Sequence, residues 1–209
     1  MYLIAVVVNL LLPCGPDFAT GLIERSLVQI AAGTSDSITP SGTGFAVSGD
    51  GHILTSRRAV MDLATGLPRP LILVKLPGGL VVQGHFVGAD ANDDLAMVKV
   101  DGVDDLRPAK WGDVGSCVVG QRLVAAGYVM PGDGRFASAP TFAYGAISSL
   151  GGLGGAGYVE HQAEVSSTMI GGPLLTMCGE VVGVSTKAGG TAVASSVAQA
   201  RAAEWSAIR

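Results

Sequence analysis

Few side chains of this sequence could carry out nucleophilic or acid–base chemistry. The 209 residues include three histidines, and His161 is followed closely by the hydroxyl side chains of Ser166, Ser167 and Thr168. A histidine that removes a proton from a nearby hydroxyl is the basis of hydrolysis through a covalent intermediate. This group is therefore one candidate for hydrolytic chemistry, provided that the fold brings the side chains together.

The other histidines and a group of acids could instead bind a metal ion. Asp90, Asp93 and Asp94 lie in one short segment, and His52 and His85 are separate from it in the sequence. Carboxylates are suitable ligands for hard cations, but a solvent-exposed acidic turn accounts for the same residues. The residues alone thus allow a hard-cation patch at these aspartates and provide no ligand set for another metal.

The three cysteines, Cys14, Cys117 and Cys178, are far apart and form no CxxC pair of the kind that binds zinc or undergoes redox chemistry. Buried free thiols account for them, with a Cys117–Cys178 disulfide as the alternative. Cys14 also follows Leu-Leu-Pro, which is similar to a lipoprotein cleavage site except for the proline. Lipid attachment at Cys14 is a further hypothesis.

Residues 2–12 form an apolar run that is interrupted by Asn9. The run is shorter than the ~20 residues that cross a bilayer, and no Lys or Arg precedes Arg25. It could be a weak signal, a membrane anchor or the start of a piece of a longer protein. Membrane association through this segment therefore stays open.

The composition excludes some classes of partner. Hydrophobic residues make up 48% of the chain, charged residues make up 14%, and 31 residues are glycine, which favours a compact, turn-rich globular domain. The net charge of −4 provides no basic surface for nucleic acid. The glycine-rich segment 151–155 lacks the Lys-Ser/Thr that follows a phosphate-binding loop. We expect no nucleic-acid partner.

Short strands must position the candidate residues, because apolar or alternating runs separated by Gly, Pro, Asn and Asp extend over most of the chain. The first series of strands is predicted at residues 27–32, 43–48, 52–55, 71–76, 80–87 and 95–100. The second series is predicted at residues 122–129, 141–148, 158–164, 173–175, 180–185 and 191–194. The repeated rhythm indicates two similar β halves.

The chain divides into three parts. Residues 1–25 contain the apolar run and a short helix at 17–25 capped by Asp17, and residues 26–110 and 111–209 are the two β halves. An amphipathic helix is predicted at 195–207. The glycine-rich segments 131–139 and 150–157 are too long for hairpins, so we expect mobile loops there.

Three segments of the sequence carry a resemblance to a known family. The first is Ser-Gly-Thr-Gly-Phe-Ala-Val at 41–47 with Asp-Gly-His-Ile-Leu-Thr at 50–55, and the second is Asp-Asp-Leu-Ala-Met-Val-Lys-Val at 93–100. The third is Gly-Gly-Pro-Leu-Leu at 171–175 with Gly-Glu-Val-Val-Gly-Val at 179–184. Together they resemble the HtrA/DegP family of trypsin-like serine proteases. The resemblance implies an all-β fold, a trypsin-like double six-stranded β-barrel with a short C-terminal helix.

The resemblance also assigns the catalytic positions, and two of three are altered. A serine protease needs a nucleophilic serine, a histidine base and an aspartate that orients the histidine. The family's histidine corresponds to Arg58, its serine to Ile170 and its aspartate to Asp94. Arg58 stays protonated and has no lone pair to accept a proton, and Ile170 is no nucleophile. We expect a pseudoprotease that needs no cofactor for catalysis, with Asp94 either paired to Arg58 or bonded to the backbone at its strand start.

The oxyanion loop contains Thr168, Met169 and Gly171 and is altered as well. Thr168 replaces a glycine whose backbone freedom the family uses in this turn. A β-branched residue tolerates such conformations poorly. The resemblance therefore predicts a collapsed or reshaped oxyanion hole.

A domain of this kind without turnover would act by binding. An exposed strand edge at Tyr158, Glu160, His161 and Gln162 could add a peptide as a further strand. The expected partner is a peptide or a protein, for example an active HtrA-type protease that the domain regulates. The resemblance implies an extracytoplasmic location, periplasm-like or within a magnetosome.

Two other functions stay open. The family includes degenerate, MamO-like magnetosome proteins that are associated with transition-metal binding, and the loss of His and Ser with a kept Asp is similar to that subgroup. The remaining alternative is a hydrolase that uses relocated residues such as His161 with Ser166 or Ser167.

Overall fold

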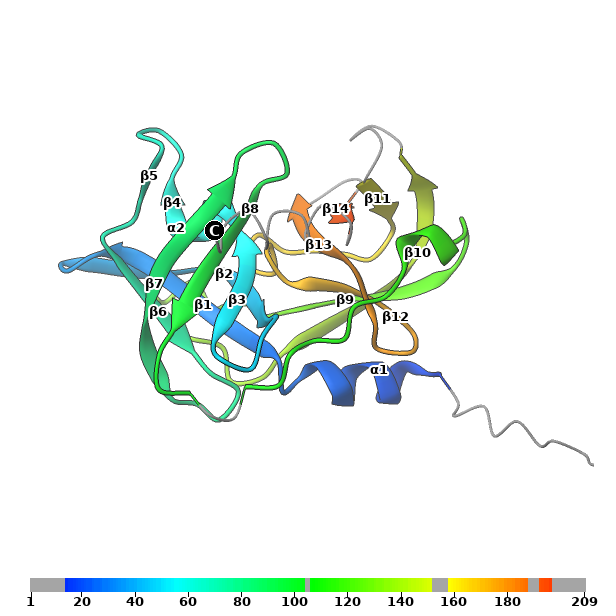
Figure 1. Cartoon of the computed structure of the whole chain (residues 1–209), viewed down its shortest axis with the longest axis horizontal. Helices are drawn as coiled ribbons and strands as arrows, with labels where there is room; N and C mark the ends of the chain where they lie inside the picture. The colour runs from blue at the N-terminus through cyan, green and yellow to red at the C-terminus, as the bar shows by residue number, and fades with distance from the viewer. Residues whose placement is uncertain (1–13, 104–105, 152–157, 188–191, 197–209) are drawn as a thin grey trace, which may run out of the picture.

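The computed structural model describes residues 14–103, 106–151, 158–187 and 192–196. Its main strands form two closed six-stranded barrels that lie side by side (Figure 1). The predicted all-β, trypsin-like double barrel is therefore confirmed. The first barrel uses strands between residues 27 and 100, and the second uses strands between residues 122 and 196.

The first barrel is antiparallel throughout and closes where β6 pairs with β1. The strand order is β1-β2-β3-β8-β7-β6. Its aliphatic interior includes Val28, Ile30, Ile53 and Val98, which are all fully buried. The strands are β1 (Leu27–Thr34), β2 (Ser37–Ala46), β3 (His52–Ser56), β6 (Leu71–Lys75), β7 (Val81–Asp90) and β8 (Leu95–Val100).

The second barrel has the order β10-β11-β14-β13-β12-β9. Its core is continuous with the contact between the barrels, because Phe45 and Leu54 of the first barrel belong to the same buried cluster as Leu123 and Leu174 of the second. One apolar core therefore fixes the two barrels against each other. The strands are β9 (Arg122–Gly127), β10 (Thr141–Leu150), β11 (Tyr158–His161), β12 (Pro173–Thr176), β13 (Val181–Lys187) and β14 (Ala192–Ser196).

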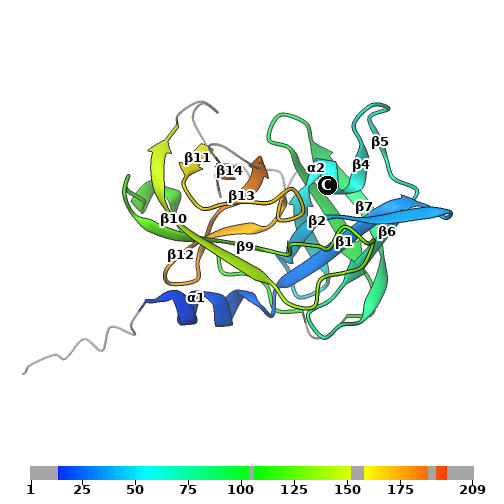
Figure 2. The ribbon, with the colours of Figure 1, turned by 180° about the vertical axis from the view of Figure 1, so that it is seen from behind.

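Four short elements were not predicted. The one-turn helix α2 (Arg57–Val60) follows β3, and the hairpin of β4 (Met61–Asp62) and β5 (Leu67–Pro68) follows α2. The single-turn 3-10 helix η1 (Val114–Ser116) precedes the second barrel. Elements this short contain no hydrophobic period that a sequence pattern could reveal. Figure 2 shows the β4–β5 hairpin projecting from the outer part of the first barrel.

Helix α1 (Pro16–Ile23) lies along the second barrel (Figure 1). Gly15 is its N-cap and Pro16 its first residue, so the prediction that Asp17 caps the helix is wrong by two positions. Proline suits the first helical position because its missing N–H would have no partner there. No helix in the described residues is long and apolar enough to span a bilayer.

A disulfide joins Cys14, just before α1, to Cys178 in the turn between β12 and β13. Cys117 is a buried free thiol. The Cys117–Cys178 alternative is therefore wrong, and the free-thiol prediction holds for Cys117 alone. Because its sulfur is in the disulfide, Cys14 as it stands in this structure cannot carry a thioether-linked lipid.

The predicted mobile loop at 131–139 is attached to the first barrel. The side chain of Gln29 donates from Nε2 to Ala137 O at 3.0 Å and accepts from Ala137 N at 2.7 Å. This pair of bonds satisfies both backbone polar groups of Ala137, which is 6% exposed. Residues 152–157 of the other predicted loop lie outside the described residues. So do residues 197–207 of the predicted C-terminal helix, while residues 195–196 belong to β14.

Candidate functional site

Arg58 and Asp94 meet at the end of the first barrel where α2 follows β3. Arg58 Nε donates to Asp94 Oδ2 at 2.8 Å. The neighbouring backbone is tied at the same point, since Arg57 N donates to Asp94 O at 2.9 Å. The expected ion pair is present, with the side chain of Asp94 directed to Arg58 and its backbone carbonyl to Arg57.

Asp94 is held in an unusual backbone conformation. Its φ is 55°, and no other non-glycine residue in the described ranges has a positive φ. Aspartate tolerates this region better than most residues. The carboxylate is 18% exposed against 45% for the Arg58 side chain. Burial raises the pKa of Asp94, and the charges of Arg58 and Arg57 oppose that rise.

Ile170 is buried against the first barrel and offers no reactive group. It is 4% exposed, and its carbonyl accepts from Thr43 N at 3.0 Å. The next residue, Gly171, has φ 87°, and a Cβ there would lie 2.3 Å from Thr43 O. The Gly-Gly-Pro motif therefore serves the close approach of this loop to β2.

Thr168 holds the predicted oxyanion loop through its own side chain. Thr168 Oγ1 donates to Tyr128 O at 2.9 Å and accepts from Met130 N at 3.1 Å. Its hydroxyl group thus bonds to two backbone groups of the segment that follows β9. Its backbone φ is not in the left-handed region. The loop thus has a conformation that does not use the freedom of the glycine that Thr168 replaces.

The loop uses most of its own N–H donors. Met169 N donates to Ser166 O at 3.1 Å, and Gly171 N donates to Ser185 O at 2.7 Å. The N–H group of Thr168 donates to no other residue in the described part of the chain. Of the three predicted oxyanion-loop positions, Thr168 is the one whose N–H has no acceptor among the described residues.

Thr43 connects the barrels and was missed in the sequence. Its side chain is fully buried. Thr43 Oγ1 donates to Thr168 O at 2.8 Å and accepts from Tyr128 N at 2.9 Å. The signal that could have revealed it is the glycine on its N-terminal side, since a Cβ on Gly42 would lie 3.1 Å from Ile170 O of the facing half.

The predicted peptide-binding edge is not available. β11 pairs with β10 on one side and with β14 on the other, so strand addition at Tyr158, Glu160 and His161 is wrong. Glu160 and His161 are also buried. Gln162 is exposed, although its N–H donates to Ala146 O at 3.0 Å.

Tyr158 instead links the second barrel to the acidic turn of the first. Its hydroxyl lies 3.1 Å from Asn92 O and 3.2 Å from Asp93 Oδ1. Asp90 Oδ1 accepts from Asn92 N at 2.8 Å and closes the turn. Burial raises the pKa of Asp93. With Asp94 on Arg58, each acid of this turn has its own protein partner, which favours a structural turn over a cation site.

His161 does not activate a hydroxyl. It is 1% exposed, so the expectation that it lies on an exposed strand edge is wrong. Neither ring nitrogen has a hydrogen bond of normal geometry to a described residue. Burial lowers the pKa of His161 to about 4. Ser166 Oγ lies 3.4 Å from Thr168 Oγ1. In the described part of the chain, the partner of this serine hydroxyl is therefore a threonine hydroxyl and not the His161 ring.

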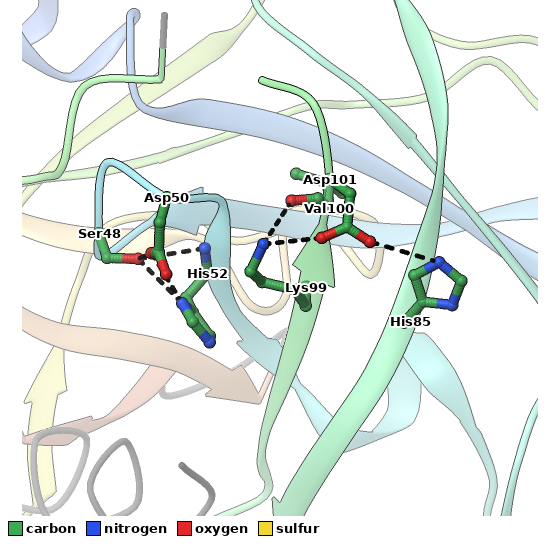
Figure 3. Close-up of polar contacts among 7 residues, drawn as sticks. All are labelled: Ser48, Asp50, His52, His85, Lys99, Val100 and Asp101. Atoms are coloured by element: carbon green, nitrogen blue, oxygen red, sulfur yellow. Dashed lines mark hydrogen bonds and ion pairs between the residues drawn. The ribbon is translucent and has the colours of Figure 1, made fainter. Parts of the chain in front are cut away.

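The other two histidines belong to two separate polar groups on the first barrel (Figure 3). His52 Nδ1 lies 3.1 Å from Ser48 Oγ and 2.9 Å from Asp50 Oδ1. A catalytic base uses one ring nitrogen for the aspartate and the other for the serine, whereas both contacts here fall on Nδ1. Ser48 and His52 lower the pKa of Asp50 to about 2. This trio therefore lacks the geometry of a catalytic triad.

His85 lies two strands away, in a second polar group with Lys99 and Asp101 (Figure 3). Lys99 of β8 is opposite both His52 of β3 and His85 of β7. Asp101 accepts from Lys99 Nζ at 2.9 Å and lies 3.8 Å from His85 Nε2. An ammonium group thus stands between the two imidazoles, which disfavours a shared metal ion.

Comparison with known proteins agrees with this fold. A family model described as trypsin-like peptidase domain matches residues 42–184. A DegP-like periplasmic serine endoprotease of Pseudomonas fluorescens is 32% identical over 150 residues, which cover 70% of this chain and 29% of the relative. The serine protease HhoB of Synechocystis is 30% identical over 148 residues, which cover 70% of this chain and 34% of that protein. The chain thus spans about a third of the length of such relatives.

Solved structures have the same architecture. The HtrA-type protease AlgW with a decapeptide superposes with a TM-score of 0.77 at 19% identity, covering 92% of this chain and 67% of that one. The serine endoprotease of Yersinia pestis gives 0.76 at 22% identity, covering 92% and 66%. With the double barrel and the three sequence segments, these matches show that the chain belongs to the trypsin-like peptidase domain family as an HtrA-like domain.

Proposed function

We propose that this domain does not cleave peptides and acts by binding a protein or peptide where the two barrels meet. The observation that carries the proposal is the contact of Arg58 with Asp94, in which Arg58 Nε donates to Asp94 Oδ2 at 2.8 Å. A guanidinium has no lone pair with which to take a proton from a nucleophile. The hydrophobic Ile170 supplies no nucleophile either, so both proton transfer and acyl transfer lack their groups.

Arg58 and the segment that leads to Thr168 offer polar groups to a bound chain. Arg58 remains 45% exposed, Gln162, Glu164 and Ser167 are exposed, and the Thr168 N–H has no described acceptor. The HtrA-type protease AlgW was solved with a decapeptide, which supports a peptide as the class of ligand. An active HtrA-type protease is a partner of this kind, and regulation of it is the role that we propose.

The test combines an activity assay with a matched repair. The wild-type domain is incubated with casein and with a fluorophosphonate probe, and we expect neither hydrolysis nor labelling. The variant Arg58→His, Ile170→Ser, Thr168→Gly restores the family's groups and reports whether these positions alone block the chemistry. Phosphonate labelling of any serine in the wild-type protein would refute the proposal.

The transition-metal alternative has no supporting observation in the described residues, where no three His, Cys, Asp or Glu side chains form a group that could hold a metal ion. Calorimetric titration with iron, manganese and zinc separates the two functions. If the domain only binds peptide, titration with these metal ions should produce no heat above that of dilution.

An extracytoplasmic location is part of the proposal. The DegP-like relatives of Pseudomonas are described as periplasmic. The Cys14–Cys178 disulfide is an independent argument, because such bonds form and persist in oxidising compartments and are rare in the reducing cytosol. Thiol labelling of protein taken from each cellular fraction tests this location, since labelling of both cysteines before reduction would contradict it.

A further inference from the structure

Two adjoining cavities lie beside the chain that enters β1 and the turn between β6 and β7. Their volumes are ≈ 410 and ≈ 400 Å³. Arg25, Leu76, Pro77 and Gly78 line both. Each has the size of a small-molecule site. Neither is lined by Arg58, so they are separate from the site of the proposed function.

The first cavity is aliphatic. Leu76, Leu80, Val103 and Leu106 contribute to its wall. Leu80 is 61% exposed, although the transfer of a leucine side chain out of water is favourable. A Cβ built on Gly78 would meet no atom within 4 Å, which shows that there is free space beside the turn. An apolar group of a ligand would fill this space and cover Leu80.

The second cavity is polar and carries two cations. Lys75 and Arg25 line it, and Glu24 is its one acidic lining residue. Lys75 Nζ donates to Ala137 O at 3.1 Å and lies 5.8 Å from the centre of the Phe136 ring. This contact uses one of the three ammonium protons.

Arg25 is free to bind a ligand. It is exposed and forms no hydrogen bond or ion pair with any residue in the described ranges. It also stands where the two cavities meet, with aliphatic side chains on one side and Lys75 on the other. Guanidinium groups prefer carboxylates, to which they donate two parallel hydrogen bonds. With Glu24 counted, the lining has one net positive charge, which matches a monoanion.

We propose that the paired cavities bind an aliphatic chain that ends in a carboxylate. The chain lies along Leu76, Leu80 and Leu106, and the carboxylate lies between Arg25 and Lys75. A peptide with a leucine at its free C-terminus and a fatty acid both have this chemistry. The paired cavities would thus be a second ligand site of the domain. Binding there does not depend on whether the site at Arg58 binds peptide.

Calorimetric titration of the full chain tests the proposal with three probes: N-acetyl-Ala-Leu-Leu with a free carboxylate, the same peptide as its C-terminal amide, and decanoate. We expect the free acid, decanoate or both to bind, and the amide to bind at least about tenfold more weakly, a difference of ~1.4 kcal/mol. Binding of the peptide acid alone identifies a peptide terminus as the source, and binding of decanoate alone identifies a fatty acid.

Variants locate the binding. Arg25→Gln should weaken it about tenfold, whereas Arg135→Gln, a matched change at an 84% exposed arginine outside both cavities, should leave it unchanged. Gly78→Leu should abolish binding by filling the free space, at an unchanged melting temperature. The proposal is overturned if no probe binds, if the amide binds as tightly as the acid, or if Arg25→Gln and Gly78→Leu both bind like the wild type.

Discussion

Replacing Thr43 with valine removes one hydroxyl group and keeps the shape of the side chain. In the folded protein this hydroxyl donates to Thr168 O at 2.8 Å and accepts from Tyr128 N at 2.9 Å. Thr43 is fully buried and Tyr128 is 6% exposed, so water has little access to the groups that lose their partner. The substitution therefore isolates the polar link between the barrels.

The expected effect follows from the two bonds. A buried donor or acceptor left without a partner costs about 1–3 kcal/mol, so with two such groups we expect Thr43→Val to lower the free energy of unfolding by about 2–6 kcal/mol. Valine leaves no cavity that would add to this cost. The control Thr43→Ser keeps the hydroxyl and removes one buried methyl group, which should cost about 1 kcal/mol.

Urea unfolding followed by tryptophan fluorescence measures both variants, with the disulfide kept intact. Trp111 is a suitable reporter, because its ring lies 5.9 Å from that of buried Phe45. The midpoint should fall further for valine than for serine at an unchanged m value. If valine is no more destabilising than serine, the hydroxyl does not hold the barrels together and the reasoning fails.

Three further measurements test other parts of the structure. Replacing Cys14 and Cys178 together with serine removes a link between residues 164 apart and should cost about 3–5 kcal/mol of stability; an unchanged urea midpoint would argue against the bond. Because burial lowers the pKa of His161 from 6.5 to about 4, the unfolded chain binds more protons, so stability should decline as pH falls through this window by up to about 3 kcal/mol and be retained above it. His161→Gln should flatten this pH dependence. Tyr158→Phe should cost about 1 kcal/mol and raise the pKa of Asp93 further in an NMR titration, since the Tyr158 hydroxyl lowers it.

The strands were predictable because their signals are local. The turn residues at 48–51 and 77–79 separate apolar runs that became β2, β3, β6 and β7. The ion pair of Arg58 with Asp94 was also predictable, because the family resemblance placed both residues at known positions of a known fold. Local pattern thus predicted the strands of the two barrels, and the resemblance predicted that Arg58 and Asp94 would meet.

The remainder depends on contacts between distant residues. The partner of Cys178 is Cys14, and no spacing rule selects it over Cys117. The predicted edge at Tyr158 failed because an alternating segment has the same pattern whether one neighbour pairs with it or two. Nothing in the sequence around His161 shows that its ring would be buried, since that depends on how the second barrel closes.

Closure of the two barrels also affects how readily the protein aggregates when it opens locally. β1 pairs with β2 and β6, and β9 pairs with β10 and β12. Strands bonded on both sides present no template on which another copy could polymerise. A barrel strand would expose an edge only after one strand pair of its barrel has separated, which breaks several hydrogen bonds together. An extracytoplasmic compartment, where we place this domain, would make that resistance to aggregation useful.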